Sequence, residues 1–277
     1  MAGGFPRENC RIVGTPIGNL QDMTPRGVQA LSEADIIFAE DTRTARALLN
    51  YLKLSKPIES YHKDNEGRAS AKAIKHLSEG KRIALVSEAG MPGISDPGML
   101  FIKEAIRANI PFEVIPGACA ALNALLASGL SGRGSFLFYG FLPRKGAEAV
   151  LLKLKKIPFP IVIYESCHRI AQTAELLLKY FPPPLAVCRE LTKIYEEVVW
   201  LNSPHETEKI TPKGEFTLVV NNESAEREEK TDGEQVSVAA LTEVLKDRGV
   251  GRAEIMDILK KLGVKRNKAY RGYLKGL

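Results

Sequence analysis

The chain has 277 residues, of which 44% are hydrophobic, and a formal net charge of +6. At about 100–200 residues per domain, this length predicts two or three domains of a soluble protein with a real core. No apolar run is long enough to span a membrane, and the first ten residues contain no hydrophobic signal region, so we expect a cytoplasmic protein. The four cysteines lack zinc-site spacing and the four histidines are scattered, so we expect reduced thiols and no metal.

The charge is unevenly distributed along the chain. Residues 240–277 contain ten Lys or Arg against four Asp or Glu, whereas residues 221–234 contain two against six. An acidic, polar segment followed by a basic tail predicts a linker and a small appended module. A basic module suits a polyanion such as nucleic acid, although solvated Lys-rich helices often carry similar charge without binding one.

Strand-like and helix-like runs alternate through the first 130 residues, which predicts a mostly parallel sheet with helices on its faces. A glycine-rich break at 128–135 predicts a domain boundary. The expected strands are 10–15, 36–39, 82–87 and 111–115, and the expected helices are 26–33, 42–54, 68–79, 99–109 and 119–126.

A second α/β unit is expected after the break, with strands at 136–139 and 161–165 and helices at 147–156 and 171–180. Three further strands follow without long helical runs between them, which predicts antiparallel hairpins and a mixed sheet. These strands are 185–189, 196–201 and 215–220.

The basic tail fits three short helices, at 238–246, 252–262 and 267–274. Glycines at 249, 251 and 263 are expected to act as C-caps and turns between them. Two helices, a short turn and a basic third helix resemble a helix-turn-helix module.

The most informative stretch is residues 87–98, Ser-Glu-Ala-Gly-Met-Pro-Gly-Ile-Ser-Asp-Pro-Gly. It follows an expected buried strand and precedes an amphipathic run that begins at Met99. Ser95 or Asp96 is expected to cap the next helix, with Pro97 at its first position. A strand, a small-residue loop and a helix are how an open α/β sheet builds a ligand pocket, although an elaborate turn would share this pattern.

Other strand ends carry comparable loops. The loop at 13–19 contains glycines but neither the dinucleotide fingerprint nor a P-loop, which removes the support for those two functions. After the next strand, Asp41 can cap a helix, while Arg43 in the first turn opposes the helix dipole and hints at an anionic partner. Small, basic or carboxylate residues also follow four later strands, and this recurrence predicts a ligand crevice between two domains: 116–120, 140–145, 165–169 and 189–193.

Taken in order, these motifs resemble those of the tetrapyrrole-methylase-like superfamily, and more narrowly those of the bacterial small-subunit ribosomal RNA (cytidine-2′-O)-methyltransferases. The resemblance covers about residues 10–220. Met91 and Cys119 stand where the pattern usually has hydroxyl residues, so we expect no essential hydroxyl at either position. The matching segments are GTPIGN, AEDTR, SEAGMPGISDPG, PGACA, GFLPRK, YESCHR, RELTK and GEF.

The resemblance implies two α/β domains, residues 1–130 and 131–222, with S-adenosylmethionine bound in the cleft between them. An acidic linker at 223–235 and a basic RNA-binding module at 236–277 complete the expected organisation, and a homodimer is implied. The residues implied to contact the donor are Glu88, Ala89, Gly90, Gly93, Ile94, Ser95, Gly117, Ala118, Cys119, Ala120, Tyr139, Leu142, Glu165, Ser166, Val187, Cys188, Glu215, Phe216 and Thr217.

Methyl transfer to a ribose hydroxyl of small-subunit ribosomal RNA requires a group that removes the hydroxyl proton. Asp41, Glu88, Glu190 and a desolvated Lys193 are the candidates, and the sequence does not choose among them. Cations would bind the RNA backbone, with those of the tail at steps of three and four on one helix face. They are Arg43, Arg144, Lys145, Arg169 and Lys193 near the cleft, and Lys265, Lys268, Arg271 and Lys275 in the tail.

Two other functions share part of this pattern. A methyltransferase for a small molecule such as a tetrapyrrole would need the donor loops but no basic tail. A non-catalytic RNA-binding factor in ribosome assembly would need the tail but would tolerate the loss of the loops.

Overall fold

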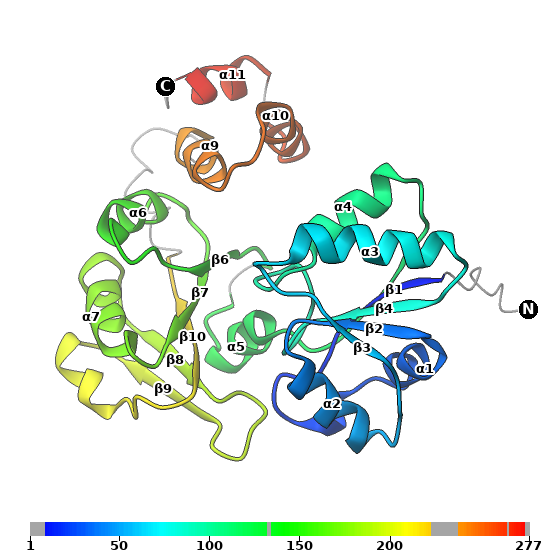
Figure 1. Cartoon of the computed structure of the whole chain (residues 1–277). Coiled ribbons are helices and arrows are strands. Elements are labelled where there is room, and N and C mark those ends of the chain that lie inside the picture. Colours follow the sequence, from blue (N-terminus) through cyan, green and yellow to red (C-terminus); the bar gives the residue numbers. More distant parts are fainter. Residues whose placement is uncertain (1–8, 132–133, 223–237, 265, 275–277) are drawn as a thin grey trace, which may run out of the picture. The chain divides into compact units, whose positions relative to one another are not determined.

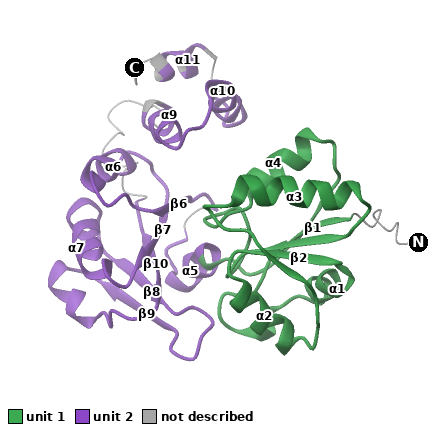
Figure 2. Cartoon of the chain, viewed as in Figure 1, with its two compact units in different colours: residues 1–120 green, residues 121–277 purple. Residues whose placement is uncertain are grey.

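The computed structural model describes residues 9–131, 134–222, 238–264 and 266–274, whose elements are labelled in Figure 1. The chain divides into two compact units, residues 1–120 and 121–277 (Figure 2). The division falls after Ala120 instead of at the glycine-rich break, so that nearly all of α5 (Ala120–Ser128) belongs to the second unit. The limits of the acidic linker and the basic module stay predictions.

The first unit contains a parallel sheet with helices, as its alternating elements predict. The sheet has five strands in the order β3-β2-β4-β1-β5. Its strands are β1 (Cys10–Val13), β2 (Ile36–Ala39), β3 (Ile58–Ser60), β4 (Ile83–Val86) and β5 (Glu113–Ile115). Its helices are η1 (Leu20–Asp22), α1 (Pro25–Glu33), α2 (Thr42–Tyr51), α3 (Glu66–Ser78) and α4 (Met99–Arg107).

Helices cover both faces of this sheet (Figure 1). Successive residues of a strand point to opposite faces, so Ile37 packs with α1 and α2 while Phe38 packs with α3 and α4. All four residues of β2 are buried, as are those of β1 and β4. Strands buried on both faces read as continuous apolar runs, which is why the sequence predicts them.

Two local expectations for this unit were wrong or missing. Strand β3 was not predicted, because three half-exposed edge residues carry almost no periodic signal. Helix α4 begins at Met99 with Gly98 as its N-cap, at φ 141°, so neither Ser95 nor Asp96 caps it and Pro97 lies outside it.

The second unit contains a mixed sheet, as predicted, and its strand order is β6-β7-β10-β8-β9. The hairpin of β8 and β9 is confirmed, but β10 does not pair with β9; it lies between β7 and β8, antiparallel to both. The strands are β6 (Leu137–Phe141), β7 (Ile161–Ser166), β8 (Leu185–Arg189), β9 (Glu197–Leu201) and β10 (Glu215–Val220), and the helices besides α5 are α6 (Ala147–Leu154), α7 (Ile170–Tyr180) and η2 (Pro204–Lys209).

Side chains of the central strand β10 pack on both faces of this sheet. Phe216 and Leu218 join the core formed with α6 and α7, while Thr217 and its alternating neighbours lie on the opposite face. Helix α5 contacts that opposite face: the Sγ of Cys188 donates to a carbonyl of α5 at 3.8 Å, and the Nε1 of Trp200 donates to another at 2.9 Å.

Three C-terminal helices follow close to their predicted bounds: α9 (Val238–Asp247), α10 (Arg252–Lys261) and α11 (Arg266–Leu274). They share a small core of their own. Gly249 and Gly263 form left-handed turns at φ 73° and 76°, as predicted, but Gly251 is the N-cap of α10 and not a C-cap. No helix in the described part of the chain has the length and apolarity to cross a membrane.

Candidate active site

Three loops meet at the carboxyl edge of the first sheet, after the neighbouring strands β1, β4 and β5. Gly14 and Gly117 approach so closely that a Cβ on either would lie 2.7 Å from backbone atoms of the other. Gly14 donates to the carbonyl of Ile115 at 3.1 Å, and Thr15 donates to that of Gly90 at 2.9 Å. Only glycine permits this contact, so the loops depend on one another for their shape.

The loop at 87–98 is fixed at both of its ends. The hydroxyl of Ser87 donates to the carbonyl of Gly90 at 3.1 Å, and Gly90 has φ 80°, a conformation that favours glycine. At the far end, Oε1 of Glu66 accepts from the backbone N–H of Gly98 at 3.0 Å and of Leu100 at 3.4 Å. A carboxylate from another helix thus satisfies the start of α4 where no local side chain does.

Asp41 is the N-cap of α2, as predicted. Its Oδ1 accepts from the backbone N–H of Arg43 at 2.7 Å, and its Oδ2 accepts from the guanidinium of Arg43 at 2.7 Å. These bonds lower the pKa of Asp41 to about 2. A carboxylate held so firmly in its charged form is a weak proton acceptor, so the structure disfavours Asp41 as the base.

Replacing Asp41 with asparagine is expected to remove a pH-dependent part of the stability. Because the pKa of Asp41 is lower in the folded than in the unfolded chain, its charge stabilises the fold above the ordinary value of 3.8, and this contribution is lost as the pH falls through about 2. We expect Asp41→Asn to lower Tm at pH 7 while still capping the helix, with the difference from the wild type closing between pH 4 and pH 2. Equal Tm values at pH 7 would contradict this account of the Arg43 pair.

Glu40, the residue before Asp41, is a functional candidate that the sequence did not single out. It is half-buried at the end of β2, and its Oε2 is buried with no hydrogen-bond partner among the described residues. Burial raises the pKa of Glu40, as do the charges of Glu88 and Asp41, although a hydrogen bond from the backbone of Glu88 opposes the increase. Glu40 and Asp41 are neighbours in the sequence, and only the three-dimensional structure distinguishes their two carboxyl groups.

In the second unit, Lys193 joins two carboxylates at the ends of β8 and β10. Its Nζ lies 2.9 Å from Oε1 of Glu190 and 2.9 Å from Oε2 of Glu215. Burial alone would lower the pKa of Lys193, but the two carboxylates outweigh it and raise the pKa. Lys193 is therefore a protonated cation here and not the desolvated neutral base that the sequence allowed.

Glu190 is also occupied within this cluster. Its Oε1 accepts from the backbone N–H of Glu215 at 2.9 Å as well as from Lys193. Burial alone would raise the pKa of Glu190, but these hydrogen bonds and the nearby cations hold it below its usual range. Because its carboxylate already accepts these two hydrogen bonds, Glu190 is a poor proton acceptor and acts as the ion-pair partner of Lys193.

The end of β7 is organised around the buried carboxylate of Glu165. It accepts from the backbone N–H of Ser166 and from the hydroxyl of Thr173, both at 2.7 Å, and pairs with the guanidinium of Arg169 at 3.3 Å. Arg169 also donates to the carbonyl of Leu142 at 3.2 Å. The predicted donor loops after β6 and β7 are therefore tied together within the second unit.

A profile of the tetrapyrrole (corrin/porphyrin) methylases matches residues 10–203, which include all of these strand-end loops except that of β10. The chain belongs to this family. Within the family it groups with proteins named ribosomal RNA small subunit methyltransferase I. The protein of this name from Halalkalibacterium halodurans is 41% identical over 89% of this chain and 93% of its own, and that from Bacillus subtilis is 39% identical over 89% and 92%.

Solved structures of the family have the same fold. A uroporphyrin-III C-methyltransferase from Thermus thermophilus, solved in complex with S-adenyl homocysteine, superposes with a TM-score of 0.54 at 18% identity. The match covers 79% of this chain and 98% of that one. The expected tetrapyrrole-methylase-like fold is thus confirmed, and the predicted donor agrees with the family.

Among the donor residues predicted by analogy with this family, accessibility differs widely. Ile94 is 54% exposed, whereas Leu142 and Val187 are 2% exposed and belong to the core of the second unit. Leu142 and Val187 were predicted to help form apolar walls around adenine and ribose, and their side chains pack in this core.

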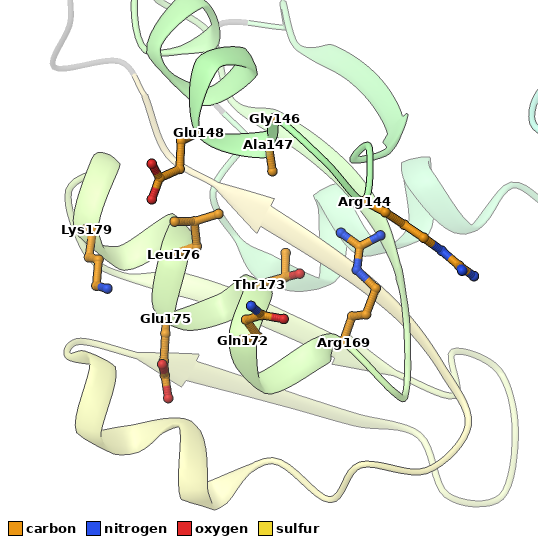
Figure 3. Close-up of a pocket in the computed structure, with 10 residues that line it drawn as sticks. All are labelled: Arg144, Gly146, Ala147, Glu148, Arg169, Gln172, Thr173, Glu175, Leu176 and Lys179. Atoms are coloured by element: carbon orange, nitrogen blue, oxygen red, sulfur yellow. The ribbon is translucent and has the colours of Figure 1, made fainter.

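Two of the cations predicted to bind RNA line a pocket of about 470 Å³ between the start of α6 and one side of α7. Figure 3 shows Arg144 and Arg169 at one end of this pocket and Glu148 and Lys179 at the other. Lys145 is exposed but does not line it. The pocket is therefore polar and of mixed charge, with two guanidinium groups at one end and a carboxylate and an ammonium group at the other. Its remaining lining residues are Gly146, Ala147, Gln172, Thr173, Glu175 and Leu176.

The basic tail is described only in part. Lys265 and Lys275 lie outside the described residues, as does the side chain of Lys268, whereas Arg271 is exposed on α11. Tyr273 packs against the small core of the three helices and the ring of Tyr270 is 45% exposed, with the guanidinium of Arg252 within 5.4 Å of both rings. Tyr273 is therefore a core residue, whereas the side chain of Tyr270 is partly open to solvent.

The described residues contain no group of three His, Cys, Asp or Glu side chains that could hold a metal ion. All four cysteines are free thiols, as expected from their spacing. Cys10 and Cys188 are buried, while Cys119 and Cys167 are half-buried.

Proposed function

We propose that this chain transfers the methyl group of S-adenosylmethionine to the ribose 2′-hydroxyl of a cytidine in small-subunit ribosomal RNA. The observation that carries the proposal is the extent of the likeness to its relatives. Identity of 41% spans 89% of this chain and 93% of a protein named for ribosomal RNA methylation. The likeness to solved tetrapyrrole methylases, at 18% identity, supports only the fold.

The loops of the first unit suit a ligand held mainly by backbone groups. In the loop after β5, the residues from Gly117 to Ala120 are all half-buried and carry short side chains or none. Small side chains leave N–H and C=O groups accessible, and a few polar groups then fix the orientation of the ligand. When bound, S-adenosylmethionine supplies a methyl group already activated by a sulfonium.

The protein has to provide alignment and a proton acceptor. Hydrogen bonds from Thr15 and Ser87 to Gly90, and from Gly98 to Glu66, keep the 87–98 loop in one shape before any ligand arrives. A preformed loop lowers the entropy cost of placing the reacting oxygen behind the methyl group. Removal of the hydroxyl proton requires a positioned basic group whose lone pair is available.

Substrate RNA would bind through cations of the second unit and through the basic module, and we propose a homodimer that acts in the cytoplasm, where ribosomal RNA is found. Arg144→Ala is expected to weaken RNA binding and to lower the slope of log affinity against log salt by about 1, because one phosphate contact is lost. Arg26→Ala is the matched control, since Arg26 is exposed but pairs with Glu113 on the first unit. An unchanged salt slope in Arg144→Ala would remove Arg144 from the RNA site.

A parallel assay separates this proposal from its two competitors. Methyl-labelled S-adenosylmethionine is incubated with small ribosomal subunits from cells that lack the protein, and with a porphyrinogen in a second tube. We expect label in the RNA alone. Label in the porphyrinogen would assign a small-molecule methyltransferase, and RNA binding without any transfer of label would assign a non-catalytic assembly factor.

A further inference from the structure

Glu40 lies where a reacting group of this site would have to be. It follows β2 directly, and β2 pairs with β4 so that Ala39 lies opposite Val86. Glu40 is therefore level with the first residues of the 87–98 loop, at the carboxyl edge of the sheet. Both the backbone and the charge of Glu88 act on the carboxyl group of Glu40, as expected for a group near that loop.

The structure gives no stabilising reason for a carboxylate at this position. Glu40 Oε2 is buried and has no hydrogen-bond partner among the described residues, a state that is normally unfavourable. The charges of Glu88 and Asp41 have the same sign as that of the Glu40 carboxylate and raise its pKa. His62 lowers this pKa, but by less than either carboxylate raises it. A glutamine could occupy the same position without burying a charge. Residues that break a local rule in this way concentrate at functional sites.

Three of the four groups that the sequence offered for proton removal are occupied. Asp41 is held by Arg43, and Glu190 and Lys193 hold each other. Glu88 is exposed to water. Glu40 combines partial burial, an oxygen with no hydrogen-bond partner among the described residues and a raised pKa, which are properties of an effective general base.

We propose that Glu40 is the catalytic proton acceptor of the methyl transfer, an inference that rests on the proposed function. As the ribose oxygen attacks, its bond to the methyl carbon forms and the carbon–sulfur bond breaks, with the electron pair left on sulfur. The O–H bond breaks in the same process and its proton moves to Oε2 of Glu40. The products are the methylated ribose, S-adenosylhomocysteine and a neutral Glu40 carboxyl, so that atoms and charges balance.

The test compares Glu40→Gln with Glu104→Gln, which changes a half-buried glutamate of α4 outside the site. We expect single-turnover methyl transfer to fall at least 100-fold in Glu40→Gln and to stay within twofold of the wild type in Glu104→Gln. Donor affinity, measured by calorimetry, should stay within about threefold in both. The wild-type rate should rise with pH through the pKa of Glu40 and then level off, and the residual rate of Glu40→Gln should lack that rise.

A stability measurement gives a readout that does not depend on turnover. Because the pKa of Glu40 is raised in the folded state, its charge destabilises the fold at pH values above that pKa, and the effect disappears below the ordinary value of 4.5. Glu40→Gln should therefore be at least as stable as the wild type at pH 7, with its advantage vanishing towards pH 4. A purely structural glutamate would give the opposite result, a fall in Tm together with the loss of activity.

The possible outcomes distinguish the role of Glu40 from the proposed methyltransferase function on which it rests. Full activity in Glu40→Gln, a loss of donor binding that accounts for the whole decrease, or a rate loss confined to Glu88→Gln would each overturn the role of Glu40 while leaving the RNA methyltransferase intact. A wild-type protein that transfers no methyl group to RNA would overturn the proposed function, and the role of Glu40 with it.

Discussion

Replacing Gly117 with alanine is expected to lower the free energy of unfolding by about 1–3 kcal/mol, the usual cost of overpacking a tight contact. The new Cβ would lie 2.7 Å from two backbone atoms of Gly14 and 2.9 Å from its carbonyl oxygen. Backbone on both sides cannot yield as a flexible side chain would, so the loops after β1 and β5 must separate. We also expect donor affinity to fall at least tenfold, because the same loops present the backbone groups proposed to hold the donor.

Gly67→Ala is the matched control for this prediction. Gly67 lies in the first turn of α3, and an added Cβ there would meet nothing within 4 Å. Alanine is the better helix former by about 1 kcal/mol, so this variant should be neutral or slightly more stable. Thermal unfolding and donor calorimetry on both variants decide the matter. A Gly117→Ala protein with wild-type Tm and donor affinity would show that the close approach of the loops is not required.

Replacing Asn222 with aspartate is expected to destabilise the second unit by about 3 kcal/mol or more at pH 7. Asn222 is buried after β10, and its Nδ2 donates to the carbonyls of Leu154, Lys155 and Ile157 at 3.1, 3.1 and 2.6 Å. A carboxylate would remove the donor from all three carbonyls and place a buried negative charge against them. The end of α6 would lose its cap.

The penalty should be smaller at low pH, because a protonated aspartate can donate one hydrogen bond. Asn50→Asp serves as the control, since Asn50 is exposed on α2 and should tolerate the change within about 0.5 kcal/mol. Urea unfolding at pH 7 and pH 4 measures both effects. If Asn222→Asp and Asn50→Asp were equally stable at pH 7, the cap on α6 would not contribute to the stability of the fold.

Sequence patterns predicted the parts of this fold that depend on neighbouring residues. The run Ile36–Ala39 is apolar throughout because helices cover it on both faces, and the small-residue loops mark strand ends because backbones must approach there. The cap at Asp41 was predictable because its partners are two and three residues away.

Contacts between distant segments were beyond such patterns. Nothing near β10 in the sequence indicates that it inserts between β7 and β8, because strand order depends on long-range pairing. The start of α4 is capped by Glu66, which is 32 residues away, so the sequence pointed to local cap residues instead. Lys193 likewise pairs with Glu215, which is 22 residues away in the sequence. This contact helps to raise the pKa of Lys193, which the sequence had allowed as a neutral base.

The acid pair at residues 40–41 illustrates the same limit within the site. Both carboxylates follow one strand, and their sequence contexts are alike. They differ in burial and in their partners. Asp41 forms an ion pair with Arg43, whereas the Oε2 atom of Glu40 is buried in the protein. Local sequence does not indicate which of the two carboxyl groups is buried. This burial distinguishes Asp41, the helix cap, from Glu40, the proposed proton acceptor.

The central claim is that this chain methylates a ribose of small-subunit ribosomal RNA, and the most direct measurement is a nucleoside analysis of the product. Small subunits from cells that lack the protein are incubated with it and methyl-labelled S-adenosylmethionine, and the RNA is digested completely to nucleosides and separated with mass detection. We expect the label in 2′-O-methylcytidine, with the methyl group on the ribose fragment. Label on a base, or no label in RNA after donor binding has been verified, would contradict the account.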